Sequence, residues 1–107
     1  MGDTNHFMKP PPDVSLQPKY VFRQVVEILY SRHQNYRAVI STDKEGHFRV
    51  HREHWDTPEW ELVKIAFWNP DDGGFATITG DLINARKLSM EALASTSDGF
   101  DADAPTC

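Results

Sequence analysis

Three closely spaced histidines, His47, His51 and His54, are the residues of this sequence that first suggest metal chemistry. On a strand, His47 and His51 share a face, but at about 3.3 Å per residue they lie roughly 13 Å apart. Zinc holds nitrogen ligands at about 2.0–2.1 Å, so these two cannot bind one ion. His51 and His54 share a face only on a helix, at a spacing one residue short of the zinc-peptidase patterns. We therefore expect solvated surface histidines and no metal site.

The run from Asn69 to Gly74 superficially resembles a calcium loop. A loop of that kind beginning at Asn69 would need an acidic residue at position 73 and a glutamate at position 80. Glycine occupies both positions. We interpret the run as a turn between two strands.

Catalytic groups are equally sparse. No serine or threonine stands in the glycine-flanked turn that exposes a catalytic hydroxyl, and Cys107 lies in a terminal segment that cannot hold it against a base. His51 and Glu53 share a strand face, which leaves open a small enzyme with His51 as general base. Charged side chains on neighbouring strands more commonly stabilise a sheet surface. The sequence thus favours a protein without enzymatic activity, with no catalytic residues and no cofactor.

Length and charge limit the partners. The chain of 107 residues has room for one domain, and its net charge of −5 is unevenly distributed. Three aspartates and no basic residue lie in segment 95–107, whereas segment 18–94 has ten Lys/Arg and eleven Asp/Glu. This near-neutral body lacks the basic excess of a duplex-DNA binder. No apolar stretch reaches the roughly 18 residues of a membrane span. The single cysteine agrees with a reducing compartment, so we expect a cytoplasmic protein without a membrane partner.

Hydrophobic periodicity predicts an α+β domain over residues 18–94, between a flexible proline-rich arm (1–17) and a disordered acidic tail (95–107). The apolar residues after Pro18 fall within one helical arc, so the first element should be a helix over 18–33. Asp81 should cap a second helix that ends near Ala94. Between the helices we expect four strands, near 36–42, 47–55, 60–68 and 75–79. Short turns connect them, which predicts a four-stranded antiparallel meander in the order α-β-β-β-β-α.

Alternation along these strands assigns side chains to two faces of the sheet. One face is largely aliphatic and should seat the first helix. It collects Tyr36, Ala38, Ile40, Phe48, Val50, Val63, Ile65, Phe67, Ala76 and Ile78. The other face gathers the three tryptophans among basic residues. The binding residues predicted there are Arg49, His51, Trp55, Trp60, Lys64, Trp68 and Phe75.

So much aromatic area should not be left in water, because large exposed apolar patches generally mark interfaces. Three candidates could cover this face. The first is the second helix. The next is another protein, either a foreign partner or a second copy in a homodimer. The last is a small ligand or single-stranded nucleic acid that stacks on the rings while Arg37, Arg49 and Lys64 meet phosphate.

The leading functional hypothesis is a small non-enzymatic protein-interaction module. An inhibitor, an immunity-type protein or an adaptor would fit, with the partner on the tryptophan-rich face or on the acidic tail. The alternative is a binder of small ligands or single-stranded nucleic acid on the same face. A small enzyme with a histidine base is the weaker alternative.

Overall fold

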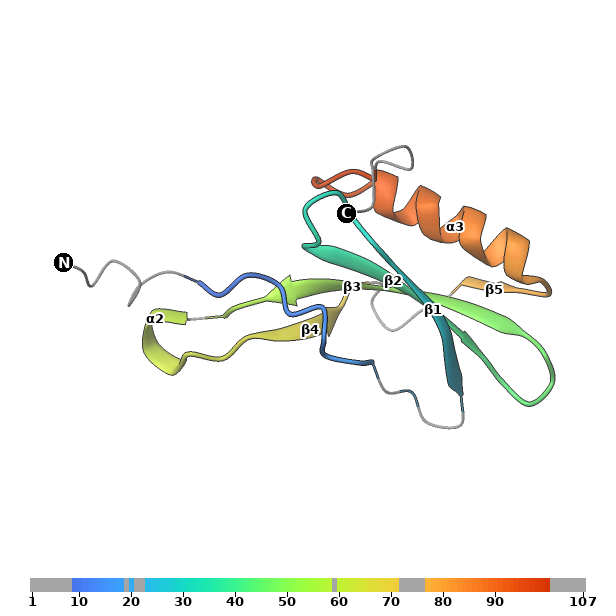
Figure 1. Cartoon of the computed structure of the whole chain (residues 1–107), viewed down its shortest axis with the longest axis horizontal. Coiled ribbons are helices and arrows are strands. Elements are labelled where there is room, and N and C mark those ends of the chain that lie inside the picture. Colours follow the sequence, from blue (N-terminus) through green and yellow to red (C-terminus); the bar gives the residue numbers. More distant parts are fainter. Residues whose placement is uncertain (1–8, 19, 21–22, 59, 72–76, 101–107) are drawn as a thin grey trace.

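The structure is a computed structural model that describes residues 9–18, 20, 23–58, 60–71 and 77–100. It has a mixed α+β fold in which one long helix lies across an antiparallel sheet (Figure 1). In chain order the elements are β1 (Gln24–Tyr30), β2 (Tyr36–Thr42), β3 (Phe48–Asp56), α2 (Trp60–Val63), β4 (Phe67–Pro70), β5 (Thr77–Thr79) and α3 (Leu82–Ala94). The predicted class and the antiparallel sheet are confirmed.

The sheet is organised around β3. Its strands lie in the order β1-β2-β3-β4, and β5 also pairs with β3. β4 pairs with the segment Glu53–Asp56 and β5 with the segment Phe48–Val50, so the two short strands share one edge of β3. The predicted third strand over 60–68 is wrong, because a helical turn occupies 60–63 and pairing resumes at Phe67. The sheet is therefore five-stranded and not a simple meander.

The predicted N-terminal helix over 18–33 is also wrong, since β1 lies in its place. β1 pairs with β2, and a bulge between Val25 and Glu27 shifts its register by one residue. The inserted residue interrupts strict alternation, so the apolar spacing imitates a helical period. The β-branched residues Val25, Val26 and Ile28 favour the extended form. Pairing with β2 thus decides a segment whose local pattern fits both structures.

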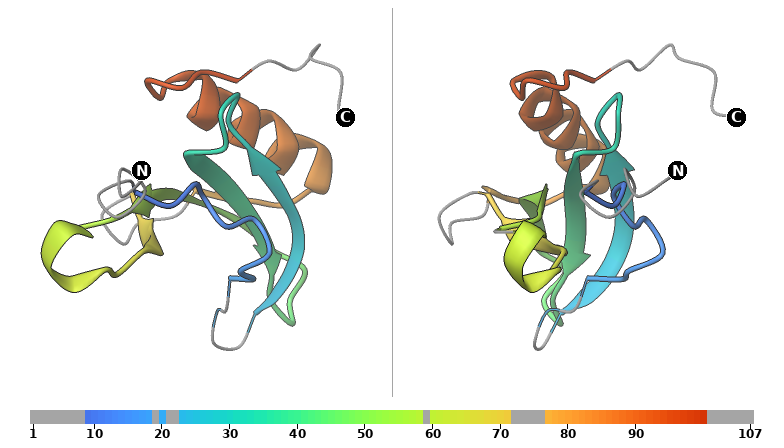
Figure 2. Two further views of the ribbon diagram at one scale, coloured as in Figure 1. Left: turned by 60° about the vertical axis from the view of Figure 1, so that its left-hand side comes forward. Right: turned by 90° about the vertical axis from the view of Figure 1, so that its left-hand side faces the viewer.

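α3 confirms the predicted second helix. Asp81 caps it by accepting a hydrogen bond from the Asn84 backbone N–H at 2.6 Å. Ala85, Ser89 and Leu93 are buried at four-residue intervals along one side of α3. This side packs on Ala38, Ile40 and Val50, the centre of the predicted aliphatic face. The helix seated on that face is therefore α3 and not the first element of the chain (Figure 2).

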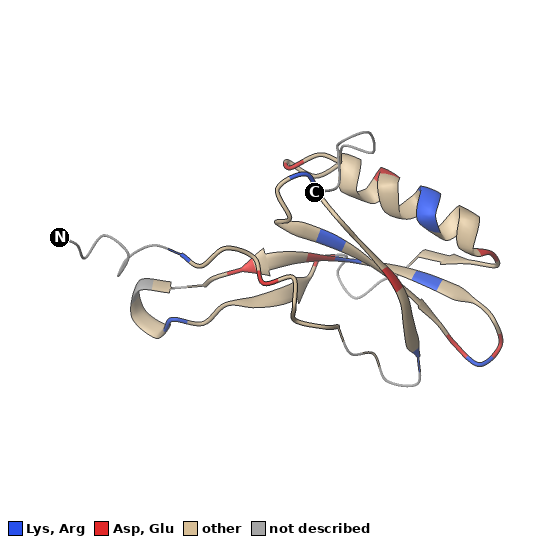
Figure 3. Cartoon of the chain, in the orientation of Figure 1, with Lys and Arg blue, Asp and Glu red and all other residues tan. Residues whose placement is uncertain are grey.

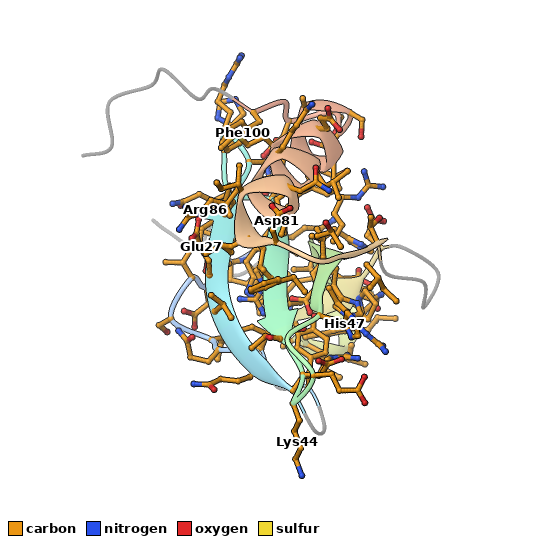
Figure 4. All side chains as sticks on the ribbon, turned by 90° about the vertical axis from the view of Figure 1, so that its right-hand side faces the viewer. Glu27, Lys44, His47, Asp81, Arg86 and Phe100 are labelled. Atoms are coloured by element: carbon orange, nitrogen blue, oxygen red, sulfur yellow. The ribbon has the colours of Figure 1, made fainter. Side chains whose placement is uncertain are left out.

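Two polar anchors fix α3 and the segment that follows it. Arg86 on α3 pairs with Glu27 on β1 at 2.8 Å (Figure 4). Asp98 accepts hydrogen bonds from the Ser31 hydroxyl, the His33 backbone N–H, and both the backbone and side-chain N–H groups of Asn35. Burial raises the pKa of Asp98, but the hydrogen bonds outweigh it and hold the pKa below its ordinary value. Residues 95–100 of the predicted tail thus contact the body, and residues 101–107 lie outside the described chain.

Candidate functional site

The face of the sheet opposite α3 carries an aromatic and ionic cluster that we call the indole face, formed by Tyr30, Arg37, Glu53, Trp55 and Trp68. Strand register brings these residues together: Arg37 is paired with Tyr30 on one side and with Glu53 on the other. Trp55 is paired with Trp68, and their rings meet edge to face at 5.3 Å between centroids. The indole face therefore crosses four strands.

A buried ion pair lies at its centre. Arg37 Nε is 2.6 Å from Glu53 Oε1, and the two side chains are only 2% and 9% exposed. The second carboxylate oxygen of Glu53 accepts a hydrogen bond from the Tyr20 hydroxyl at 2.6 Å. The Arg37 guanidinium carbon also lies 4.3 Å from the centroid of the Trp68 ring. These contacts neutralise both charges and fix the orientation of the Arg37 guanidinium.

The proline-rich arm covers the indole face. Four side chains of the face donate hydrogen bonds to main-chain carbonyls of the arm. They are Trp55 Nε1 to Pro10 at 3.1 Å, Trp68 Nε1 to Asp13 at 2.9 Å, Tyr30 Oη to Val14 at 3.3 Å and Arg37 Nη1 to Leu16 at 2.7 Å. The arm and α3 thus lie on opposite sides of the sheet (Figure 2). α3, which was one expected cover of this face, packs on the other one.

The arm is a cover that sequence reasoning missed, and with it the roles of Tyr20, Tyr30 and Glu53. A signal was present in Lys9-Pro10-Pro11-Pro12. Polyproline segments make no internal hydrogen bonds, so their carbonyls are free to accept, and they dock against aromatic-lined grooves. The Trp55 donor to Pro10 matches that mode of recognition, whereas the other three donors bind the turn that follows the prolines.

His51 and Arg49 lie on the same side of the sheet, beyond the ion pair. The His51 ring stacks on Tyr20 with a centroid separation of 4.6 Å, and Arg23 Nη2 lies 3.2 Å from His51 Nε2. Arg49 is paired with Ser41 on β2 and with Ile78 on β5. Ile78 was expected on the aliphatic face. Its pairing with Arg49 places it on the other face, so the side chains of β5 point to the opposite faces from those predicted. The region between His51 and the β2–β3 turn thus combines the polar Arg49 and Ser41 with the exposed Ile78.

The other predicted binding residues are distributed differently. Trp60 begins α2 instead of lying in a strand, and Lys64 follows that turn with a positive φ of 55°. The Lys64 ammonium lies 5.7 Å from the centroid of the Trp60 ring. Phe75 lies outside the described residues. Trp60 and Lys64 thus flank the indole face from a helical turn.

Metal and charge patterns add little. In the described residues no group of three His, Cys, Asp or Glu side chains has the geometry to hold a metal ion. His47 lies 3.7 Å from both Asp43 and Glu45 at the exposed β2–β3 turn, and a backbone hydrogen bond from His47 is the main cause that lowers the pKa of Asp43. Acidic and basic residues are interspersed along the ribbon (Figure 3). Within the described chain no helix is both long and apolar enough to cross a bilayer.

A comparison with known proteins gave no match, whether to a family model, a curated protein sequence or a solved structure.

Proposed function

We propose that this protein is a non-enzymatic interaction module whose indole face holds a segment of polypeptide by its main-chain carbonyls. The observation that supports the proposal is the set of four side-chain donors aimed at four carbonyls of one segment, which makes a hydrogen-bonded turn from Asp13 to Leu16. Within the arm these groups donate only to main-chain oxygens, so they select for the path of the backbone more than for particular side chains. In the isolated chain, the arm is the occupant.

The geometry favours polypeptide over single-stranded nucleic acid. Bases would stack on the faces of the rings, but Trp68 presents one face to the Arg37 guanidinium and an edge contact to Trp55. The charge of Arg37 is already neutralised by Glu53. A phosphate placed there would have to compete with a buried carboxylate at 2.6 Å. The nucleic-acid hypothesis is therefore kept as one outcome of the test.

The test supplies the arm in trans. The full chain would carry Pro10→Gly, Pro11→Gly and Pro12→Gly, which keep the carbonyls but raise the entropic cost of ordering the arm. We call this protein the loosened-arm chain. A synthetic peptide with the sequence of residues 9–17 is then titrated, and tryptophan fluorescence and calorimetry report the affinity. We expect the peptide to bind the loosened-arm chain more tightly than the unchanged chain, in which the arm competes.

A donor-loss variant separates hydrogen bonding from folding. Trp68→Phe keeps most of the ring area but removes the N–H. In the loosened-arm chain it should lower the affinity for the peptide by about tenfold, the scale of one hydrogen bond. Lys44→Ala, at the exposed β2–β3 turn, is the matched control and should change nothing. Binding of an oligothymidylate that falls steeply with salt, without peptide binding, would replace the proposal by the nucleic-acid function. Light scattering on the unchanged chain tests the homodimer.

A further inference from the structure

A pocket remains open between the arm and the α2 turn, beside the indole face. Its volume is about 500 Å³. The walls contributed by the folded body are Trp55, Trp60, Lys64 and Ala66, and the arm contributes Pro10, Pro11, Pro12, Asp13 and Leu16. The arm therefore crosses the indole face but leaves a space unfilled beside the α2 turn. We call the indole face together with this pocket the groove.

The indole N–H of Trp60 differs from those of the other two tryptophans. Trp55 and Trp68 both donate to carbonyls of the arm, whereas the buried Trp60 Nε1 has no acceptor in the described structure. A buried N–H without an acceptor has lost its hydrogen bond to water with no replacement, so an unmatched donor in a pocket wall is a feature that a ligand would satisfy. Trp60 thus indicates a bound group with an oxygen acceptor.

The charged residues of the pocket favour an anionic acceptor. Lys64 adopts a left-handed backbone with φ of 55°, a conformation that is uncommon outside glycine, and its ammonium lies 5.7 Å from the Trp60 ring centroid. Asp13 of the arm lines the same pocket, but its Oδ1 accepts from the backbone N–H and hydroxyl of Ser15. That local turn orients the carboxylate toward the arm itself. The Trp60 N–H accordingly stays unmatched while the arm is in place.

We infer that this pocket is a side-chain subsite of the groove and takes a carboxylate from the bound polypeptide. The inference rests on the proposed function, and it names the chemistry of the partner: a proline-containing segment with an acidic residue at the position facing α2. One carboxylate oxygen accepts from Trp60 Nε1, and the negative charge is stabilised by the Lys64 ammonium. Such a segment outcompetes the arm, because it satisfies a donor that the arm leaves unmatched.

The experiment uses the loosened-arm chain and three substituted peptides. The peptide of residues 9–17 is made with Pro10→Glu, Pro11→Glu or Pro12→Glu, and each has a glutamine counterpart. At one of the three positions, the glutamate peptide should bind about tenfold more tightly than the glutamine peptide, as expected for a hydrogen bond to a charged group. Trp60→Phe, which removes the N–H and keeps a ring, should abolish that preference.

Trp55→Phe is the matched control, because it removes the donor to Pro10 and should weaken all the peptides alike. The inference is overturned if no glutamate peptide is preferred over its glutamine counterpart, or if the preference survives Trp60→Phe. In either case the unsubstituted peptide still binds, and the proposed function stands. If the unsubstituted peptide does not bind either, the proposed function fails and the inference fails with it.

Discussion

Arg37 and Glu53 are direct cross-strand partners on β2 and β3, and they form a buried ion pair with 2.6 Å between Nε and Oε1. The pair connects the sheet to the arm, because Arg37 also donates to the Leu16 carbonyl and Glu53 also accepts from Tyr20. Stability and the occupancy of the indole face are therefore coupled through these two residues.

Removing one partner of this pair should be far more costly than replacing both. Glu53→Ala leaves the Arg37 charge buried without its carboxylate, and we expect the free energy of unfolding to fall by about 3–5 kcal/mol. The double variant Arg37→Met with Glu53→Leu should recover most of that loss, because no unpaired charge remains. Urea denaturation measures both values. A double variant no more stable than Glu53→Ala would contradict this account.

Asp98 should make stability depend on pH in the acid range. Its pKa in the folded protein lies below the ordinary value of 3.8, so its contribution to stability is complete above that value. The contribution is lost as the pH falls through the folded-state pKa, because protonation removes the charged acceptor. Asp98→Asn should lower stability at pH 7 by about 2 kcal/mol, on the scale of hydrogen bonds to a charged group, and flatten the decline below pH 4. Urea midpoints measured from about pH 2 to pH 7 test this.

The start of α3 depends on one side chain. Asp81→Ala removes the acceptor of the Asn84 backbone N–H and should lower the free energy of unfolding by about 1 kcal/mol. Asp81→Asn keeps a capping oxygen and should have little effect. Thermal unfolding followed by circular dichroism compares the two. Equal losses in both variants would show that the aspartate acts through something other than capping.

Leu93 tests whether α3 holds the core. Leu93 is fully buried, and Leu93→Ala should cost about 2–5 kcal/mol through lost burial and the cavity left behind. Ile83 lies on the same helix but is 80% exposed, so Ile83→Ala should change stability by no more than about 0.5 kcal/mol. Urea unfolding of the two variants gives the comparison, and similar losses would exclude the packing described for α3.

The elements that were predictable are those in which local and tertiary preferences agree. The boundaries of β2 follow from its alternation and turns, and α3 begins at Asp81 because the cap is a local signal. β1 was not predictable, since its bulge disturbs the alternation and only pairing with β2 distinguishes strand from helix. α2 interrupts the predicted third strand at Trp60, where alternation gives no indication of a turn.

The candidate site was predictable only in part. Parity along β3 places Trp55 on the face of Glu53, and pairing with β4 brings Trp68 beside it. The covering arm was not predicted, because its contacts with the sheet use main-chain carbonyls that the side-chain pattern of a sequence does not reveal. The unmatched N–H of Trp60 becomes apparent only when the neighbouring atoms are known.

The position of α3 in the chain has a consequence for synthesis. β1, β2 and β3 leave the ribosome before the helix that packs on Ala38, Ile40 and Val50. The nascent sheet must therefore expose its aliphatic side until Leu93 has emerged from the exit tunnel. A translation pause at any point before Leu93 has left the tunnel would prolong this exposed state.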